Sequence, residues 1–114
     1  MRFKGKKPIV SRKDTYSLDR VLAPVIHAGL VKFVEVLRQR EAEGYCYGVP
    51  LDFYNQETQE TDQEAWFKAL DQMVYAFADY KDIFDNSTPS NKAHHKKVTK
   101  GLKLFAKHYE SLWW

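Results

Sequence analysis

The sequence predicts an all-α fold: a compact bundle of three main helices, with a basic N-terminal arm and a long loop between the first two helices. Three segments repeat apolar residues every three or four positions, which is the period of one helical face. Residues typical of turns separate these segments. The chain has 114 residues, of which 44% are apolar and 29% charged, as in a single globular domain. We therefore expect an arm over residues 1–13 and one helical domain over residues 14–114.

The first helix is expected directly after the arm. Asp14, Thr15 and Ser17 carry side-chain oxygens that can cap its first turn, and Gly44 is a suitable end. Pro24 removes a backbone donor inside this segment, so the helix should kink there or restart. The predicted apolar face consists of Leu18, Val21, Leu22, Val25, Ile26, Leu30, Phe33, Val34 and Leu37.

Two further helices are expected after a long loop over residues 44–61. Thr61 and Glu64 have the spacing of a capping box, which places the start of the second helix there. After the turn-forming residues 85–91, Ser90 or Asn91 is expected to cap the third helix, which should lie at the centre of the bundle. No segment has a convincing strand pattern. The predicted core faces are Trp66, Phe67, Leu70, Met73, Val74 and Phe77 in the second helix, and Val98, Leu102, Phe105, Tyr109 and Leu112 in the third.

Charge is distributed unevenly along the chain, although the net charge is only +3. Residues 1–13 contain six basic residues and no acid, Glu41 to Asp85 contains eleven acids against two lysines, and Lys92 to Lys107 contains six lysines and no acid. Either the acidic middle faces the basic ends, within or between subunits, or one basic surface is kept for an anionic ligand. Because a chain this short has a thin stability margin, we also expect a homo-oligomer.

The single cysteine, Cys46, cannot form an internal disulfide, which fits a reducing compartment. Its neighbours Tyr45 and Tyr47 suggest a half-buried thiol in a loop. No apolar run approaches the roughly 18 residues of a membrane span. The basic start is followed by acids instead of the apolar core of a signal peptide. We predict a soluble, intracellular protein.

Several catalytic motifs are missing from the sequence. There is no glycine-rich phosphate loop, no Cys-x-x-Cys, no His-Glu-x-x-His and no Gly-x-Ser-x-Gly, which lowers the weight of those enzyme classes. His94 and His95 project about 100° apart on a helix and cannot share one metal site, so a zinc site would need His27 or His108 and acids from elsewhere. We predict no metal, no cofactor and no catalytic residue, and we consider an enzyme the less favoured interpretation.

The lysines of the third helix indicate anion binding. Lys96, Lys100, Lys103 and Lys107 are spaced by four, three and four residues, which keeps them on one side of a helix. Such a row can hold phosphate groups, and neighbouring aromatic rings can stack on bases. Gly101 lets a backbone or a ligand approach closely. The alternative is an ordinary solvated face with Gly101 at a helix crossing.

Asp71 and Tyr75 lie one turn apart beside the apolar face of the second helix. From there they can reach into a groove while their helix stays packed, although each is also explained as a solvated or capping side chain. The third helix has no pattern of arginine, asparagine or glutamine for reading bases, and the acidic centre of the chain would repel a polyanion. We expect no sequence-specific DNA binding.

Four motifs are spread over the three predicted helices and the long loop. They are Asp14-Thr15-Tyr16-Ser17-Leu18-Asp19 with Leu22-Ala23, then Gly48-Val49-Pro50, then Trp66-x-x-x-Leu70-Asp71-x-Met73-x-x-Ala76-Phe77, and Gly101-Leu102-x-Leu104-Phe105-x-x-x-Tyr109-x-x-Leu112-Trp113. This combination resembles a family of small, functionally unassigned proteins of tailed bacteriophages. The sequence departs from the family pattern at Tyr16, His108 and Trp114, where the family has tryptophan, tyrosine and aspartate. The resemblance implies a phage accessory protein in the cytoplasm of an infected bacterium and carries over no catalytic residue.

Together these observations favour a non-enzymatic binding protein for a small anionic, nucleotide-like ligand. Small phage proteins often counter host defences, so the ligand could be a host defence signal. The alternative is a protein-interaction module that inhibits a host defence protein through the acidic loop from Glu41 to Glu64. The candidate ligand-binding residues, cationic, acidic or aromatic, are Tyr16, Asp19, Asp71, Tyr75, Lys97, Lys100, Lys107, His108 and Trp113.

Overall fold

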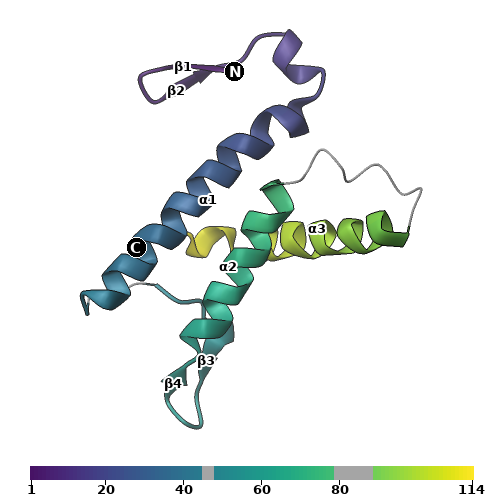
Figure 1. The fold of residues 1–114 in the computed structure, drawn as a ribbon. Helices are drawn as coiled ribbons and strands as arrows, with labels where there is room; N and C mark the ends of the chain where they lie inside the picture. Colours follow the sequence, from purple (N-terminus) through teal and green to yellow (C-terminus); the bar gives the residue numbers. More distant parts are fainter. Residues whose placement is uncertain (45–47, 79–88) are drawn as a thin grey trace.

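The computed structural model describes residues 1–44, 48–78 and 89–114, and this part of the chain contains three main helices (Figure 1). They are α1 (Leu18–Ala42), α2 (Gln63–Ala78) and α3 (Pro89–His108). The predicted helical bundle is confirmed. It is flat, with principal extents of 50 × 43 × 21 Å. The half-buried thiol predicted for Cys46, and most of the turn predicted over residues 85–91, lie outside the described residues.

Two short antiparallel hairpins interrupt the otherwise helical chain, so the prediction of no strands was wrong. The first joins β1 (Arg2–Lys4) to β2 (Lys7–Ile9) within the predicted arm. Gly5 supports its turn with a φ of +61°, a conformation that glycine adopts without steric cost. The second joins β3 (Tyr54–Asn55) to β4 (Glu60–Thr61) in the long loop. These strands have two or three residues each, too short to produce a recognisable alternation of apolar and polar residues.

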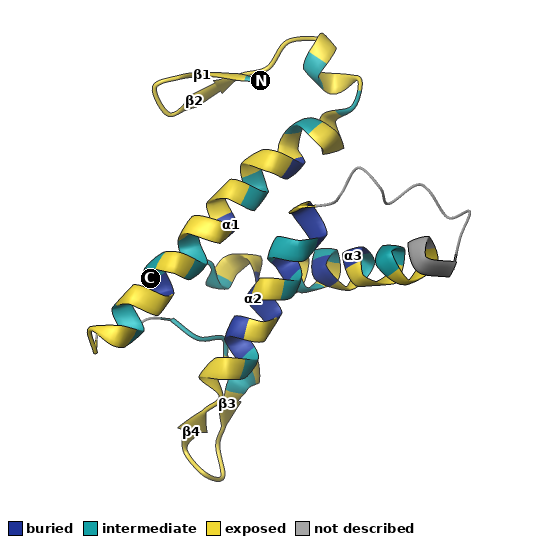
Figure 2. Ribbon diagram, in the orientation of Figure 1, coloured by how far each residue is buried: buried dark blue, intermediate teal, exposed yellow. Residues whose placement is uncertain are grey.

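Helix α2, and not α3 as predicted, is the central element. It packs against both α1 and α3, and Figure 2 shows buried residues recurring along its length, between exposed and intermediate ones. Seven of the eleven buried apolar residues in the described part of the chain belong to α2. Small residues contribute to this position, because Ala76 lies at a close crossing with Gly101 of α3. The seven are Trp66, Phe67, Ala69, Leu70, Met73, Ala76 and Phe77.

Helix α1 contacts the bundle through residues spaced seven apart. Ala23, Leu30 and Leu37 are buried, and this spacing keeps them on one face. The helix continues through Pro24, so the predicted restart does not occur. Pro24 is exposed, and water can replace the backbone hydrogen bond that it removes. The first turns of α1 extend past α2 and carry the N-terminal hairpin at their end (Figure 1).

The helix starts differ from the predicted caps. Ser17 precedes α1 without a side-chain capping bond, and the carboxylate of Asp14 turns backward instead, where it accepts hydrogen bonds from the backbone N–H of Ser11 and from the N-terminal amine of Met1. These bonds hold the pKa of Asp14 below its usual value. At α2, Asp62 replaces the predicted Thr61, since its Oδ1 accepts the backbone N–H of Ala65 at 3.0 Å.

Candidate ligand-binding cavity

A cavity of about 300 Å³ opens between α2 and α3. Its size is at the lower end of the range for small-molecule sites. The α2 residues that line it are spaced by three or four, so they form one helical face. On α3, two lysines three residues apart complete the wall. The lining residues are Lys68, Asp71, Gln72 and Tyr75 from α2 and Lys97 and Lys100 from α3.

The wall of the cavity is fixed by a close helix crossing at Gly101. A Cβ atom added to Gly101 would overlap the carbonyl oxygen of Gln72 and would lie 2.5 Å from the Cβ of Ala76. The backbones of α2 and α3 can approach this closely only because Gly101 has no side chain. The helix-crossing role that the sequence left open for Gly101 is therefore what the structure shows, and it sets the distance between Lys100 and α2.

Tyr75 is held in place inside the cavity. Its hydroxyl shares a hydrogen bond of 2.6 Å with Nδ1 of His94, and the two rings meet edge-on at 5.5 Å. The Nζ atom of Lys97 lies 5.8 Å from the centre of the Tyr75 ring, within the range of a cation–π contact. The aromatic wall is thus oriented by two α3 residues, and one face of the ring lies beside a cation.

The electrostatics of the cavity are cationic. Lys68, Lys97 and Lys100 are exposed, and no ion pair within the described ranges engages any of the three. Asp71 is the one carboxylate among the lining residues. Three ammonium groups beside one carboxylate favour a ligand with about two negative charges, which the lysines can contact without breaking an existing salt bridge.

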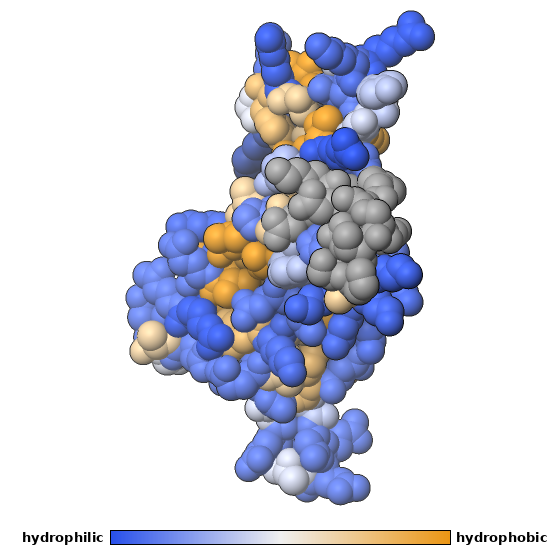
Figure 3. All heavy atoms as spheres, turned by 45° about the vertical axis from the view of Figure 1, so that its right-hand side comes forward, coloured by the Kyte–Doolittle hydropathy of each residue, from blue (hydrophilic) through white to orange (hydrophobic). Residues whose placement is uncertain are grey.

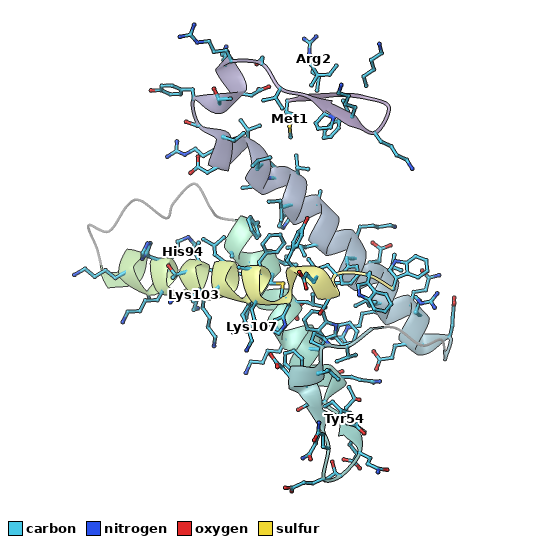
Figure 4. All side chains as sticks on the ribbon, turned by 180° about the vertical axis from the view of Figure 1, so that it is seen from behind. Met1, Arg2, Tyr54, His94, Lys103 and Lys107 are labelled. Carbon is cyan, nitrogen blue, oxygen red and sulfur yellow. The ribbon has the colours of Figure 1, made fainter. Side chains whose placement is uncertain are left out.

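A second cavity of about 520 Å³ lies along the outer side of α3. Lys100 lines both cavities, and Lys103 and Lys107 project from the same side of the helix (Figure 4). Lys107 is already paired with Asp52, whose Oδ2 lies 3.0 Å from its Nζ. The described lining of this cavity belongs to α3 alone, and its one aromatic group is the imidazole of His95, so it offers charge with little surface for stacking.

The α2–α3 cavity brings together four of the nine predicted ligand-binding residues, namely Asp71, Tyr75, Lys97 and Lys100. It also contains two residues that the sequence reasoning missed. Lys68 precedes Asp71 by three residues and Gln72 precedes Tyr75 by three, so extending the helical face from Asp71 and Tyr75 toward the N-terminus would have found both. His94 was considered only as a metal ligand, and nothing in its local sequence indicates the bond to Tyr75.

Four other predicted residues lie outside this cavity. Tyr16 is 92% exposed, and the segment that contains Tyr16 and Asp19 lies near the N-terminal hairpin, away from α3 (Figure 1). Trp113 is exposed on one side and places its ring carbons 3.4–3.5 Å from the Cβ position of Gly48. Lys107 lines the outer cavity. These residues cannot act on the same small ligand as Tyr75.

His108 was predicted to supply charge to a ligand, and the structure places it instead in the core. It is 4% exposed and lies against the rings of Phe53 and Trp66, each with its centre 5.4 Å away. Burial lowers the pKa of His108 below its usual value, since an apolar environment disfavours the charged imidazole. His108 is therefore a packing residue that closes the lower end of the α2–α3 interface.

The described ranges contain neither a cluster of metal ligands nor a membrane-spanning helix. No group of three or more His, Cys, Asp or Glu side chains there could hold a metal ion. No helix in the same ranges is both long and apolar enough to cross a bilayer. Comparison of the chain with known protein families, with curated proteins and with solved structures gave no match.

Proposed function

We propose that the protein binds a small anionic, nucleotide-like ligand in the cavity between α2 and α3, without chemical conversion. The observation that supports this is the meeting of three lysines that form no ion pair with the described residues, one fixed aromatic ring and one carboxylate around about 300 Å³. Lysines bind phosphate oxygens as mobile point charges. A tyrosine ring can stack on a base. A carboxylate accepts hydrogen bonds from base amino or ribose hydroxyl groups.

Each part of such a ligand has a matching group. Lys97 and Lys100 lie on α3 at the mouth of the cavity and would hold the phosphate. Tyr75, oriented by His94, would contact the base. Asp71 and the amide of Gln72 lie on the neighbouring turn of α2 and would contact the hydroxyl or amino groups. One face of α2 and one face of α3 are thus sufficient for all three contacts.

Calorimetric titration of the protein with a panel of linear and cyclic nucleotides tests this proposal. For a nucleotide that binds, Lys97→Ala and Lys100→Ala should each weaken binding about 10- to 100-fold, the value of one charge-assisted hydrogen bond. Lys103→Ala is the matched control, because Lys103 lies on the same helix but lines the outer cavity alone. Absence of heat with every nucleotide, or an equal loss in all three variants, would refute the cavity as the site.

An enzyme would give a different result. Turnover of the bound nucleotide that is lost in Asp71→Asn while binding remains would identify Asp71 as a catalytic group and replace the binding proposal. Asp14→Asn is a useful comparison, since Asp14 is held by Ser11 and Met1 at the far end of the molecule.

We further propose, from the motifs shared with the phage family, that the protein acts in the cytoplasm of an infected bacterium and removes a host defence signal. Self-association belongs to the same proposal. Native mass spectrometry of protein purified from infected cells tests these points together. A retained nucleotide in an oligomer supports the proposal, and a retained host protein in its place contradicts it.

The acidic hairpin supports a second candidate function, inhibition of a host protein. Residues 54–64 are exposed and project from the end of α2 (Figure 1). They include Glu57, Glu60 and Asp62, and a cavity of about 770 Å³ lies beside them. An acidic, projecting surface suits a basic partner. A stoichiometric partner pulled down from lysate should be lost by the double variant Glu57→Lys with Glu60→Lys and kept by Lys97→Ala. This result would favour inhibition of a host protein over nucleotide binding.

A further inference from the structure

The N-terminal turns of α1 carry a second apolar surface that the bundle leaves uncovered. We call it the α1 stripe and define it as Leu18, Val21, Leu22 and Val25. At about 100° per residue, these side chains centre roughly 130° around the helix from the buried face. Leu18, Leu22 and Val25 are 39%, 36% and 43% exposed. Their spacing of four and three is that of a helix–helix seam.

The N-terminal hairpin extends this surface. Phe3, Ile9 and Val10 are each at least half exposed. Figure 3 shows apolar atoms at this end of the molecule, surrounded by charged residues. The hairpin does not hang loose, because the N-terminal amine of Met1 forms an ion pair of 3.1 Å with Asp14, next to the start of α1. This contact ties the hairpin to the turn that precedes the α1 stripe.

The exposed area of the chain is larger than a monomer of its mass requires. The surface is 8523 Å² for a chain of 13.4 kDa, whereas folded monomers of this mass expose about 6,500 Å². The radius of gyration is 16.5 Å, against about 13 Å for a compact domain of this length. A standard interface removes about 800 Å² from each partner. Burial of the α1 stripe and hairpin can supply this area and still leave a normal surface.

The distribution of charge constrains how a second copy can cover the stripe. The basic hairpin lies at one end of the molecule, and the acidic β3–β4 hairpin lies at the opposite end (Figure 1), so the two cannot meet within one chain. A second copy packed antiparallel on the α1 stripe reverses the ends. This keeps the two basic hairpins apart, whereas a parallel second copy would bring them together, and like charges repel.

We infer that two copies of the chain pair through an antiparallel contact of their α1 stripes, with the two basic N-terminal hairpins at opposite ends of the contact. A two-fold axis of this kind makes the interface self-complementary. The interface lies on α1 and does not involve the α2–α3 cavity, so the inference does not depend on the proposed ligand.

Sedimentation equilibrium over about 1–100 μM protein tests the pairing. The wild-type chain should sediment at twice its mass of 13.4 kDa. Leu22→Lys with Val25→Lys should raise the dimer dissociation constant at least about a hundredfold, because it places unpaired charges in the contact. Val31→Lys is the matched control: Val31 is 42% exposed on the same helix but lies on the other side from the stripe. Its dimer should persist.

Cross-linking reports the orientation of the two copies. In a Cys46→Ser background, an antiparallel contact places position 18 of one copy near position 25 of the other. Mixed Leu18→Cys and Val25→Cys proteins should then form the mixed disulfide in preference to either homodimer. A monomeric wild type at 100 μM, equal dissociation of the Val31→Lys control, or preferential disulfide homodimers of Leu18→Cys would each overturn the inference. Far-UV circular dichroism checks that every variant remains folded.

Discussion

Substitution of Gly101 by alanine should destabilise the protein, although alanine is the better helix former. In an exposed helical position, replacing glycine by alanine stabilises by about 1 kcal/mol. At Gly101 the added methyl group would overlap the carbonyl oxygen of Gln72 and lie 2.5 Å from the Cβ of Ala76. A helical carbonyl cannot rotate away, so α2 and α3 must separate by about an ångström along their crossing, which is overpacking against backbone.

The net effect follows from these two opposed terms. Overpacking of a core contact costs about 1–3 kcal/mol and occasionally more, and contact with backbone places Gly101 at the upper end. After subtraction of the gain in helix propensity, Gly101→Ala should lower the free energy of unfolding by about 2 kcal/mol. Urea denaturation followed by circular dichroism at 222 nm measures this.

Gly29→Ala is the control for the Gly101 prediction. Gly29 is also in the middle of a helix, and no atom lies within 4 Å of its Cβ position. It should therefore show only the gain in propensity, a stabilisation of about 0.5–1 kcal/mol. If Gly101→Ala were as stable as Gly29→Ala, the close crossing of α2 and α3 would be wrong.

Two further predictions concern the start of α2 and the buried histidine. Asp62→Ala should lower the free energy of unfolding by about 1 kcal/mol because the backbone N–H of Ala65 loses its cap. Asp62→Asn should retain most of the wild-type stability, since the asparagine oxygen can also cap. Equal losses for the two variants in thermal denaturation would contradict the capping role. Burial lowers the pKa of His108, so on acidification the unfolded chain takes up a proton before the folded chain does. The contribution of His108 to stability should therefore be complete above about pH 6.5. Below that pH the free energy of unfolding should fall, by at most about 1.4 kcal/mol per pH unit. His108→Phe should flatten that slope between about pH 5 and 7, and an unchanged slope would refute the assignment.

The helices were predictable because their signal is long and periodic. The buried faces of α2 and of α1 from Leu30 onward follow the predicted spacing of apolar residues. Leu18, Leu22 and Val25 were wrongly predicted to share the α1 core face, because the bundle does not reach the first turns of α1.

The hairpins were not predictable, since each depends on a turn such as that at Gly5, with a φ of +61°, and on strands of two or three residues. Periodicity also cannot say which helix is central. That position depends on close contacts such as the one between Ala76 and Gly101, which are visible only when the neighbouring helix is in place.

The candidate site was half predictable for a similar reason. Asp71 and Tyr75 share one turn, and Lys97 and Lys100 share another, so each pair follows from local spacing. Their meeting depends on how α2 and α3 cross, which Gly101 determines through a contact between segments far apart in the chain. His108 was misassigned because it continues a row of lysines in sequence. Its burial depends on Phe53 and Trp66, which come from the long loop and α2.

The two proposed surfaces are physically separate, and this bears on how they could communicate. α2 lies between α1 and α3, with Leu70 and Met73 fully buried in it. Coupling between the α1 stripe and the ligand cavity would need a structural element with two alternative conformations, whose populations change when either site is occupied. The close crossing at Gly101 leaves no room for α3 to slide on α2, so such an element is not available there. Pairing of two copies would therefore place two independent cavities in one particle, which increases capacity for a ligand without making its binding cooperative.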